Sequence, residues 1–329
     1  MSISVRELIG AIEEKYPLYL QEAWDNSGWQ IGLLDAGDDI KRVLVALEIT
    51  RETVDEAVQS GAELIVEHHP LFFGKVAHID ASISAPGPEG AYTAALIGAG
   101  ISVYAAHTTF DTADGGMNDA LAGALGLAEV TGFPRAAGAA TAGNQAGKDV
   151  GEFPRAAGAA IAGDQAGKDA GGFPRAEGIA VSGLPDGALG DSGEDGGKWM
   201  HPIGRKGMLP EGPVAFGEMI AKAEALFGME GRIKSVGDPD APVRTVAVCG
   251  GAGGDFVPDA IREGVDLYIT SDVKHHEAQW AREKGLLLID GGHWGTEKIF
   301  VPVMAAFIAR RFGDRIDVIE SKANQDPWK

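Results

Sequence analysis

Residues 64–70, with the sequence Leu-Ile-Val-Glu-His-His-Pro, place the strongest constraint on how this chain folds. An apolar run rich in Ile and Val, between Gly61 and Pro70, is typical of a buried strand in a parallel sheet. Ligands bind at the carboxyl ends of such strands, so His68 and His69 are expected at the rim. Successive strand residues point to opposite faces, so both imidazoles cannot pack inward, and a twisted exit would direct them to separate ions. For this pair alone, the alternative is one core or capping imidazole and one solvated imidazole.

Strands and helices alternate along much of the chain, which predicts an α/β protein with parallel sheets and right-handed crossovers. Strands are expected at residues 43–49, 64–68, 101–106, 245–249, 267–270 and 286–289. Helices are expected at residues 2–16, 52–60, 91–97, 117–127, 215–227, 255–263 and 293–311. Pro17 is expected to end the first helix, and Thr50 to open the second.

Potential metal ligands follow two further predicted strands. His107 and Asp111 come directly after the strand at 101–106, and His293 and Glu297 follow the strand at 286–289. If a helix begins at His293, then His293 and Glu297 are four residues apart on one face, so both would reach the same ion.

Two loop motifs each allow a structural and a functional interpretation. Asp25 and Asn26 lie between Trp24 and Trp29, either in a loop over a site or in a turn with two packed aromatic rings, and the sequence alone favours the turn. The glycine-rich residues 250–254 follow a predicted strand and would cradle a phosphate or form a tight turn. They lack the ending of a P-loop and the spacing of a dinucleotide site.

His275 and His276 begin a predicted helix after the strand at 267–270. They either face solvent or reach the site as acid and base groups or as partners of the ligands.

Composition limits the class of protein and the chemistry of any metal site. A chain of 329 residues is long enough for two domains, and its formal net charge of −20 argues against general binding of nucleic acid or anionic membranes. The single cysteine, Cys249, excludes an internal disulfide and a thiolate zinc site, so nitrogen and oxygen must hold any metal. Glu7, Glu13 and Glu14 interrupt the apolar core that a signal peptide would need, which predicts a cytoplasmic protein.

An internal repeat interrupts this pattern. Phe133, Phe153 and Phe173 each begin a Phe-Pro-Arg unit, so the period is 20 residues. The units are mostly Ala and Gly, which predicts a loosely ordered linker, with a short solenoid as the alternative. The predicted organisation is an N-terminal α/β lobe at 1–130, a linker at 131–198 and a C-terminal α/β lobe at 199–329.

Together, the strand ends supply three imidazoles and two carboxylates, from His68, His69, Asp111, His293 and Glu297. This set suits two adjacent divalent ions bridged by a carboxylate, with open positions for water. The donors do not distinguish among Zn, Fe, Mn, Co and Ni.

The chain resembles the NIF-three-like dinuclear metal-centre proteins, whose members are often named GTP cyclohydrolase 1 type 2 homologues. The resemblance covers about residues 1–130 and 200–329. It rests on five motifs: Trp24-Asp25-Asn26-x-Gly28, Glu67-His68-His69-Pro70-Leu71, His107-x-x-x-Asp111, the Val-Ala-Val-Cys-Gly-Gly of residues 246–251, and Gly292-His293-x-x-x-Glu297.

The resemblance implies two similar three-layer α/β lobes, as in a duplicated fold, and a toroidal homohexamer. It also implies two metal ions held by the five residues named above, with Asp111 as the bridge. Some members carry an inserted domain where this chain has the repeat.

The sequence therefore favours a metal-dependent hydrolase of the GTP cyclohydrolase type, acting on a nucleotide or another phosphate-bearing small molecule. His107, His275 or His276 would move protons, with His107 and His276 as the preferred candidates. The alternative is a non-catalytic protein for metal binding, regulation or delivery. A ring that binds nucleic acid is disfavoured by the net charge, unless Lys274, Arg205 and Lys206 face its opening.

Overall fold

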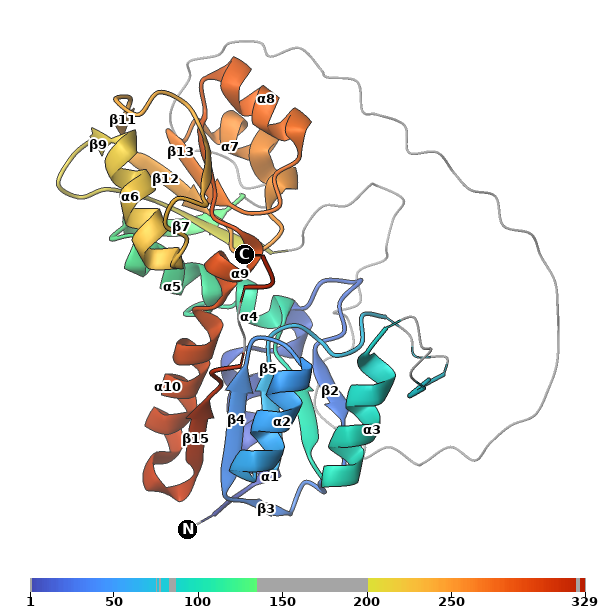
Figure 1. Cartoon of the computed structure of the whole chain (residues 1–329). Helices are drawn as coiled ribbons and strands as arrows, with labels where there is room; N and C mark the ends of the chain where they lie inside the picture. The colour runs from blue at the N-terminus through green and yellow to red at the C-terminus, as the bar shows by residue number, and fades with distance from the viewer. Residues whose placement is uncertain are drawn as a thin grey trace, which may run out of the picture. The chain divides into compact units, whose positions relative to one another are not determined.

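Two main β-sheets, each covered by helices on both faces, organise the chain in a computed structural model (Figure 1). The structure describes residues 2–74, 76, 78–82, 87–134, 201–323 and 326–328. The predicted linker at 131–198 lies outside the described residues, apart from 131–134, and so does nearly all of the repeat. None of the described helices is long and apolar enough to cross a membrane.

The first sheet has the strand order β15-β4-β5-β6-β2. Its first four strands are parallel, and β2 (Gly28–Ile31) pairs antiparallel with β6. The parallel strands are β15 (Asp317–Glu320), β4 (Arg42–Ala46), β5 (Leu64–Glu67) and β6 (Ser102–Ala105). The fully buried β5 confirms the strand expected before the two histidines.

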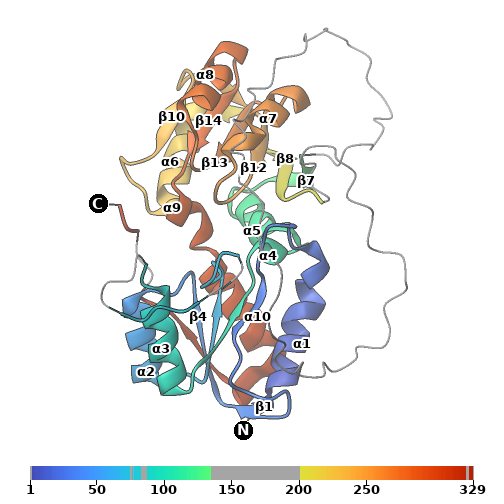
Figure 2. The ribbon, with the colours of Figure 1, turned by 90° about the vertical axis from the view of Figure 1, so that its right-hand side faces the viewer.

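Alternate residues of β4 enter different cores, because successive strand side chains point to opposite faces. Val43 and Val45 belong to the core that includes α1 (Val5–Lys15) and α10 (Phe300–Phe312). Leu44 and Ala46 belong to the core that includes α2 (Arg51–Ser60) and α3 (Glu89–Ala99). Figure 2 shows these helices on the two sides of the sheet, which makes three layers.

The second sheet has the order β10-β14-β13-β12-β8-β7, with a parallel centre of β12, β13 and β14. Helices α7 (Val257–Glu263) and α8 (His275–Lys284) pack on one face, and α5 (Met117–Ala124) and α6 (Phe216–Phe227) on the other. The strands are β7 (Ala128–Phe133), β8 (Gly204–Met208), β10 (Lys234–Val236), β12 (Thr245–Val248), β13 (Leu267–Thr270) and β14 (Leu287–Asp290).

Short elements complete the described part of the chain. Two small antiparallel pairs form, β1 (Ile3–Ser4) with β3 (Asp39–Ile40), and β9 (Val214–Ala215) with β11 (Pro242–Val243). The short helices are α4 (Thr108–Thr112), α9 (His293–Glu297) and three 3₁₀ turns at Leu18–Leu20, Gly254–Phe256 and Gly313–Arg315.

Helix starts follow the expected capping chemistry. Thr50 caps α2 by accepting a hydrogen bond from the amide of Thr53, as predicted. Ser4 and Glu7 form a capping box at the start of α1. These side chains satisfy amide groups that a helix leaves without partners in its first turn.

Sheet membership does not follow the boundaries at 130 and 199. β15 and α10 lie late in the chain but join the first sheet, because β15 adds a parallel edge strand to β4 and α10 buries its apolar face there. Conversely, β7 begins at Ala128 and pairs with β8 in the second sheet.

The single helix expected at 293–311 is wrong, because the chain forms two helices, α9 and α10. Pro302 lies in the first turn of α10, where its missing amide hydrogen is tolerated. In one continuous helix its ring would clash with the carbonyl group of Lys298.

We expect Ile308→Ala to lower the free energy of unfolding by about 2–5 kcal/mol, because Ile308 is fully buried in the core beneath α10. Arg310→Ala, at an exposed position of the same helix, is the control and should change it by less than about 0.5 kcal/mol. Urea denaturation measures both. An equal decrease in the free energy of unfolding in the two variants would contradict this packing of α10.

Candidate metal centre

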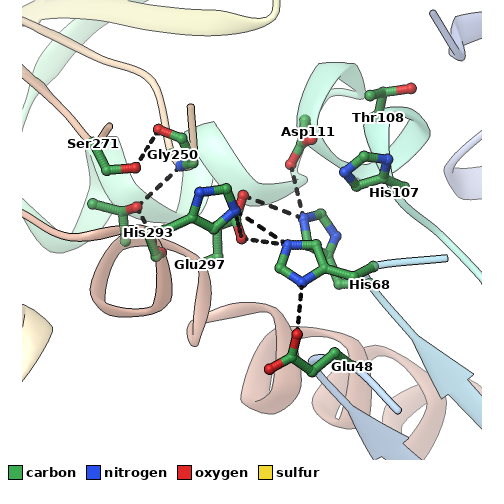
Figure 3. Close-up of polar contacts among 12 residues, drawn as sticks. Glu48, His68, His107, Thr108, Asp111, Gly250, Ser271, His293 and Glu297 are labelled. Atoms are coloured by element: carbon green, nitrogen blue, oxygen red, sulfur yellow. Dashed lines mark hydrogen bonds and ion pairs between the residues drawn. The ribbon is translucent and has the colours of Figure 1, made fainter. Parts of the chain in front are cut away.

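The residues that follow three strands of the two sheets gather in one cluster (Figure 3). His68 and His69 follow β5, and Asp111 lies on α4, which follows β6. His293 and Glu297 are the first and last residues of α9, after β14. The structure therefore brings together all five predicted ligands.

A tight turn after β5 lets two consecutive histidines serve one cluster. The amides of His68 and His69 both donate to the carbonyl of Leu47, at 3.1 and 2.9 Å. The chain thus leaves the extended conformation directly after Glu67, and the two imidazoles are no longer forced to opposite faces.

Glu297 is the centre of the polar contacts. One oxygen, Oε2, lies 2.7 Å from His69 Nε2 and 3.0 Å from His293 Nε2. Its other oxygen, Oε1, lies 3.7 Å from His68 Nε2, and Asp111 Oδ1 lies 3.6 Å from the same nitrogen. The distance between His69 Nε2 and His293 Nε2 is 3.3 Å.

The outer nitrogen, Nδ1, of each clustered histidine faces an oxygen. His68 Nδ1 is 3.0 Å from the carbonyl of Ala106, and His293 Nδ1 is 2.7 Å from Asp272. His69 Nδ1 is 3.5 Å from Glu48. An oxygen at Nδ1 fixes the tautomer with hydrogen on Nδ1, which leaves Nε2 free to bind a metal.

The pair formed by His68 Nε2 and Asp111 Oδ1 fits a cation better than a hydrogen bond. Both atoms are buried and have no hydrogen-bond partner among the described residues. Because His68 donates its Nδ1 hydrogen to the carbonyl of Ala106, its Nε2 is an acceptor, and at 3.6 Å from it Asp111 Oδ1 is too far away for a hydrogen bond. Buried polar atoms without a hydrogen-bond partner are costly, and an ion between these two would satisfy both.

The pKa shifts follow from burial and from Glu297. Burial lowers the pKa of His68 to about 4. Burial alone would also lower the pKa of His69 and of His293, but the charge and hydrogen bonds of Glu297 raise them to about 10 and about 9. Burial and the charge of Glu297 raise the pKa of Asp111, whereas His69 and His293 hold that of Glu297 below its usual range against burial.

The donor atoms fall into two overlapping groups. His68, His69 and His107 form one, and His69, His293 and Glu297 form the other. Each is suited to hold a metal ion, because its donor atoms lie within 4.8 Å of one another. Glu297 lies within 3.7 Å of three of these imidazoles, and Asp111 lies within 3.6 Å of His68; the bridging role of Asp111 stays a prediction.

His107 lies in one of the two groups that could hold a metal ion, and its predicted proton-transfer role stays a prediction. Its Nδ1 lies 2.8 Å from Asp25 Oδ1, so Nε2 is the nitrogen left for a metal. Asp25 also accepts hydrogen bonds from Ser27 and Thr108. Burial raises the pKa of Asp25, but the hydrogen bond and charge of His107 outweigh it and lower that pKa overall. Asp25, which the sequence favoured as a turn residue, therefore orients a candidate ligand.

His276 lies apart from the cluster. It is exposed on α8, and its ring contact within the described residues is with His275. The three basic residues considered for nucleic acid, Arg205, Lys206 and Lys274, form ion pairs with Asp119, Glu263 and Asp255.

The glycine-rich residues 250–254 act as a tight turn. The amides of Gly250 and Gly251 donate to Asn118 and Thr296, so neither is free for a phosphate. Gly251 has φ +68, and a Cβ there would lie 2.0 Å from Glu297 Oε1. Glycine is therefore needed for the close approach of the central carboxylate.

Glu48 and Asp272, which lie at Nδ1 of His69 and of His293, were not among the residues expected at the site. Glu48 follows β4 and Asp272 follows β13, each two residues past the last strand residue. Glu48 lies inside the strand expected at 43–49, and Asp272 follows the strand expected at 267–270, but only the placement of the loops pairs either residue with an imidazole.

Taken together, the fold and the cluster define a mixed α/β protein with a buried histidine and carboxylate site suited to metal. A family model described as Duf34/NIF3 (NGG1p interacting factor 3) matches residues 3–327. The chain belongs to this family, which confirms the resemblance seen in its motifs.

Relatives with curated names cover nearly the whole chain. A protein of Streptomyces coelicolor named GTP cyclohydrolase 1 type 2 homolog is 32% identical, over 98% of this chain and 92% of its own length. A protein of the same name from Streptococcus pneumoniae is 30% identical, over 98% and 97%.

Solved structures share the fold. A Bacillus cereus protein related to NIF3 superposes with a TM-score of 0.72 and 22% identity, covering 99% of both chains. A Staphylococcus aureus hypothetical protein gives 0.73 and 23% identity, covering 100% of this chain and 99% of its own.

We expect metal binding at pH 7 to release protons. The raised pKa values of His69 and His293 keep both imidazoles protonated without metal, and an ion must displace those protons. Metal affinity should therefore rise with pH from 7 to 9. Titration calorimetry with Mn²⁺ in buffers of different ionisation enthalpy measures the protons released. Metal binding without proton release, or an affinity that falls between pH 7 and 9, would contradict the assignment of His69 and His293 as metal ligands.

Gly251→Ala should reduce the metal bound per chain several-fold, because the added methyl group displaces Glu297. Gly264→Ala is the matched control: Gly264 has φ +65, but a Cβ there meets no atom within 4 Å. Both variants carry similar backbone strain, so elemental analysis after dialysis separates strain from displacement. Equal metal content in the two variants would refute the role of Gly251.

Proposed function

We propose that this protein is a metal-dependent hydrolase with a dinuclear centre. The observation that carries the proposal is the buried pair of His68 Nε2 and Asp111 Oδ1, which lie 3.6 Å apart and have no hydrogen-bond partner among the described residues. His68, His69, His107, Asp111, His293 and Glu297 would hold the ions. Bound divalent ions would polarise the bond under attack and lower the pKa of an attacking water.

The chain's own residues would position the centre and leave one side open. His68 is fully buried, Asp111 is nearly so, and the side chain of His293 is 37% exposed. Substrate would therefore approach past His293, while the buried side of the site keeps water away from the metal-binding atoms of His68 and Asp111. Asp25 and Asp272 would fix the orientation of His107 and His293 through Nδ1.

The proposed substrate is a nucleotide or another phosphate-bearing small molecule. The support is the name of the relatives, GTP cyclohydrolase 1 type 2 homolog, together with a donor set suited to hydrolysis. In a cyclohydrolase reaction, water would open the imidazole ring of the purine. A homohexamer and a cytoplasmic location stay predictions from the sequence.

The second candidate is a non-catalytic protein for metal binding or delivery. One observation favours it: His107 belongs to the ligand set and His276 lies apart. Among the described residues, this leaves no histidine in contact with the cluster that is free for proton transfer.

To separate these functions, the full chain is loaded with Zn²⁺, Mn²⁺ or Fe²⁺ and assayed against nucleotides and phosphoesters. We expect turnover that falls at least 100-fold in His293→Ala, because that change removes a ligand at the open side. His276→Ala should keep wild-type turnover and serves as the matched imidazole control.

Absence of turnover with every metal, while tight and exchangeable metal binding persists, would favour the non-catalytic function. Equal loss in both variants would instead place His276 in the reaction.

A further inference from the structure

Two exposed aromatic rings flank the candidate metal centre at His107. The Trp24 ring lies 5.8 Å from the His107 ring at an interplanar angle of 75°, and the Phe73 ring lies 5.8 Å away at 85°. Their exposed fractions are 57% and 68%. Within the described residues, they are the exposed aromatic side chains that touch a candidate ligand.

The loop that carries Trp24 is fixed to α4, the helix that begins directly after His107. The amide of Glu22 donates to Thr108 Oγ1 at 3.0 Å, and Thr108 Oγ1 donates to Asp25 at 2.5 Å. Asp25 also holds His107. The backbone on both sides of Trp24 is therefore anchored to α4.

The loop that carries Phe73 is fixed to the segment after Trp24. Asn26 Nδ2 donates to the carbonyl of Phe72 at 3.0 Å, and the amide of Phe72 donates to Gln30 Oε1 at 3.2 Å. Asn26 and Gln30 also bond to each other at 3.3 Å. The amide of Asn26 donates to Asp25 Oδ1 at 2.6 Å, so one hydrogen-bond network anchors the two loops that carry the rings.

Exposing two large apolar rings to water on anchored loops costs free energy, and the packing of the fold does not require this exposure. Neither ring belongs to a hydrophobic core of the described residues. Rings of this kind stabilise a bound planar group by stacking, which is how proteins hold nucleobases beside charged backbone contacts.

We propose that Trp24 and Phe73 bind the planar ring of the substrate, a nucleobase, beside the metal centre. The proposal rests on the function proposed above and narrows its substrate to molecules that carry an aromatic ring. The base would then lie beside His107, and the exposed side of His293 would stay open for the phosphates.

The test compares GTP with inorganic triphosphate as ligands of the Zn²⁺-loaded full chain, by titration calorimetry. Trp24→Leu and Phe73→Leu remove the ring and keep an apolar side chain. Each should weaken GTP binding by about 5- to 100-fold and leave triphosphate binding unchanged, as expected for the loss of one stacking contact. Trp280→Leu, at an exposed tryptophan of α8, is the matched control and should change neither.

Metal content and sedimentation velocity are measured on every variant. Wild-type GTP binding in both ring variants, equal loss of GTP and triphosphate binding, or no preference of the wild type for GTP would overturn the proposal. An altered sedimentation coefficient with unchanged GTP binding would instead assign the rings to an interface between copies of the chain. If GTP binds as expected but is not turned over, the ring-binding proposal stands and the hydrolase proposal fails.

Discussion

The structure depends on a buried group of polar atoms around His68 Nε2 and Asp111 Oδ1, two atoms that have no hydrogen-bond partner among the described residues. Asp111 Oδ1 and Glu297 Oε1 lie 3.6 and 3.7 Å from His68 Nε2, and the tautomer of His68 gives this nitrogen no hydrogen to donate to either oxygen. Such a group of acceptors is stable only if something positive joins it. In the metal-free chain, protons on His69 and His293 supply part of that charge through Glu297, and divalent ions would supply it directly.

The two sheets explain how segments far apart in the sequence reach this place. β5 and β6 of the first sheet, and β14 of the second, end at the cluster and deliver the ligands or the short helices that carry them. A common hydrophobic core, with residues from both sheets and from α1, α5, α6 and α10, joins the two halves. The glycine at position 251 then allows the backbone after β12 to pass beside Glu297.

Much of the fold and of the candidate site was predictable from the sequence, because local residue patterns determine those parts. The apolar run before His68 specified β5, and the spacing of four residues placed His293 and Glu297 on one face of α9. The parts that depend on tertiary contacts were not predictable. Nothing in residues 317–320 indicates that β15 pairs with β4, and the partners of the Nδ1 atoms, Glu48 and Asp272, are ordinary acidic residues until the loops are placed. The role of His107 depends likewise on the position of Asp25, which only the fold reveals.

The most direct test of the account is anomalous X-ray diffraction from crystals of the full chain grown with Mn²⁺ or Zn²⁺. The account predicts anomalous peaks among the side chains of His68, His69, His107, Asp111, His293 and Glu297. A metal-saturated crystal without a peak among these six residues would contradict it.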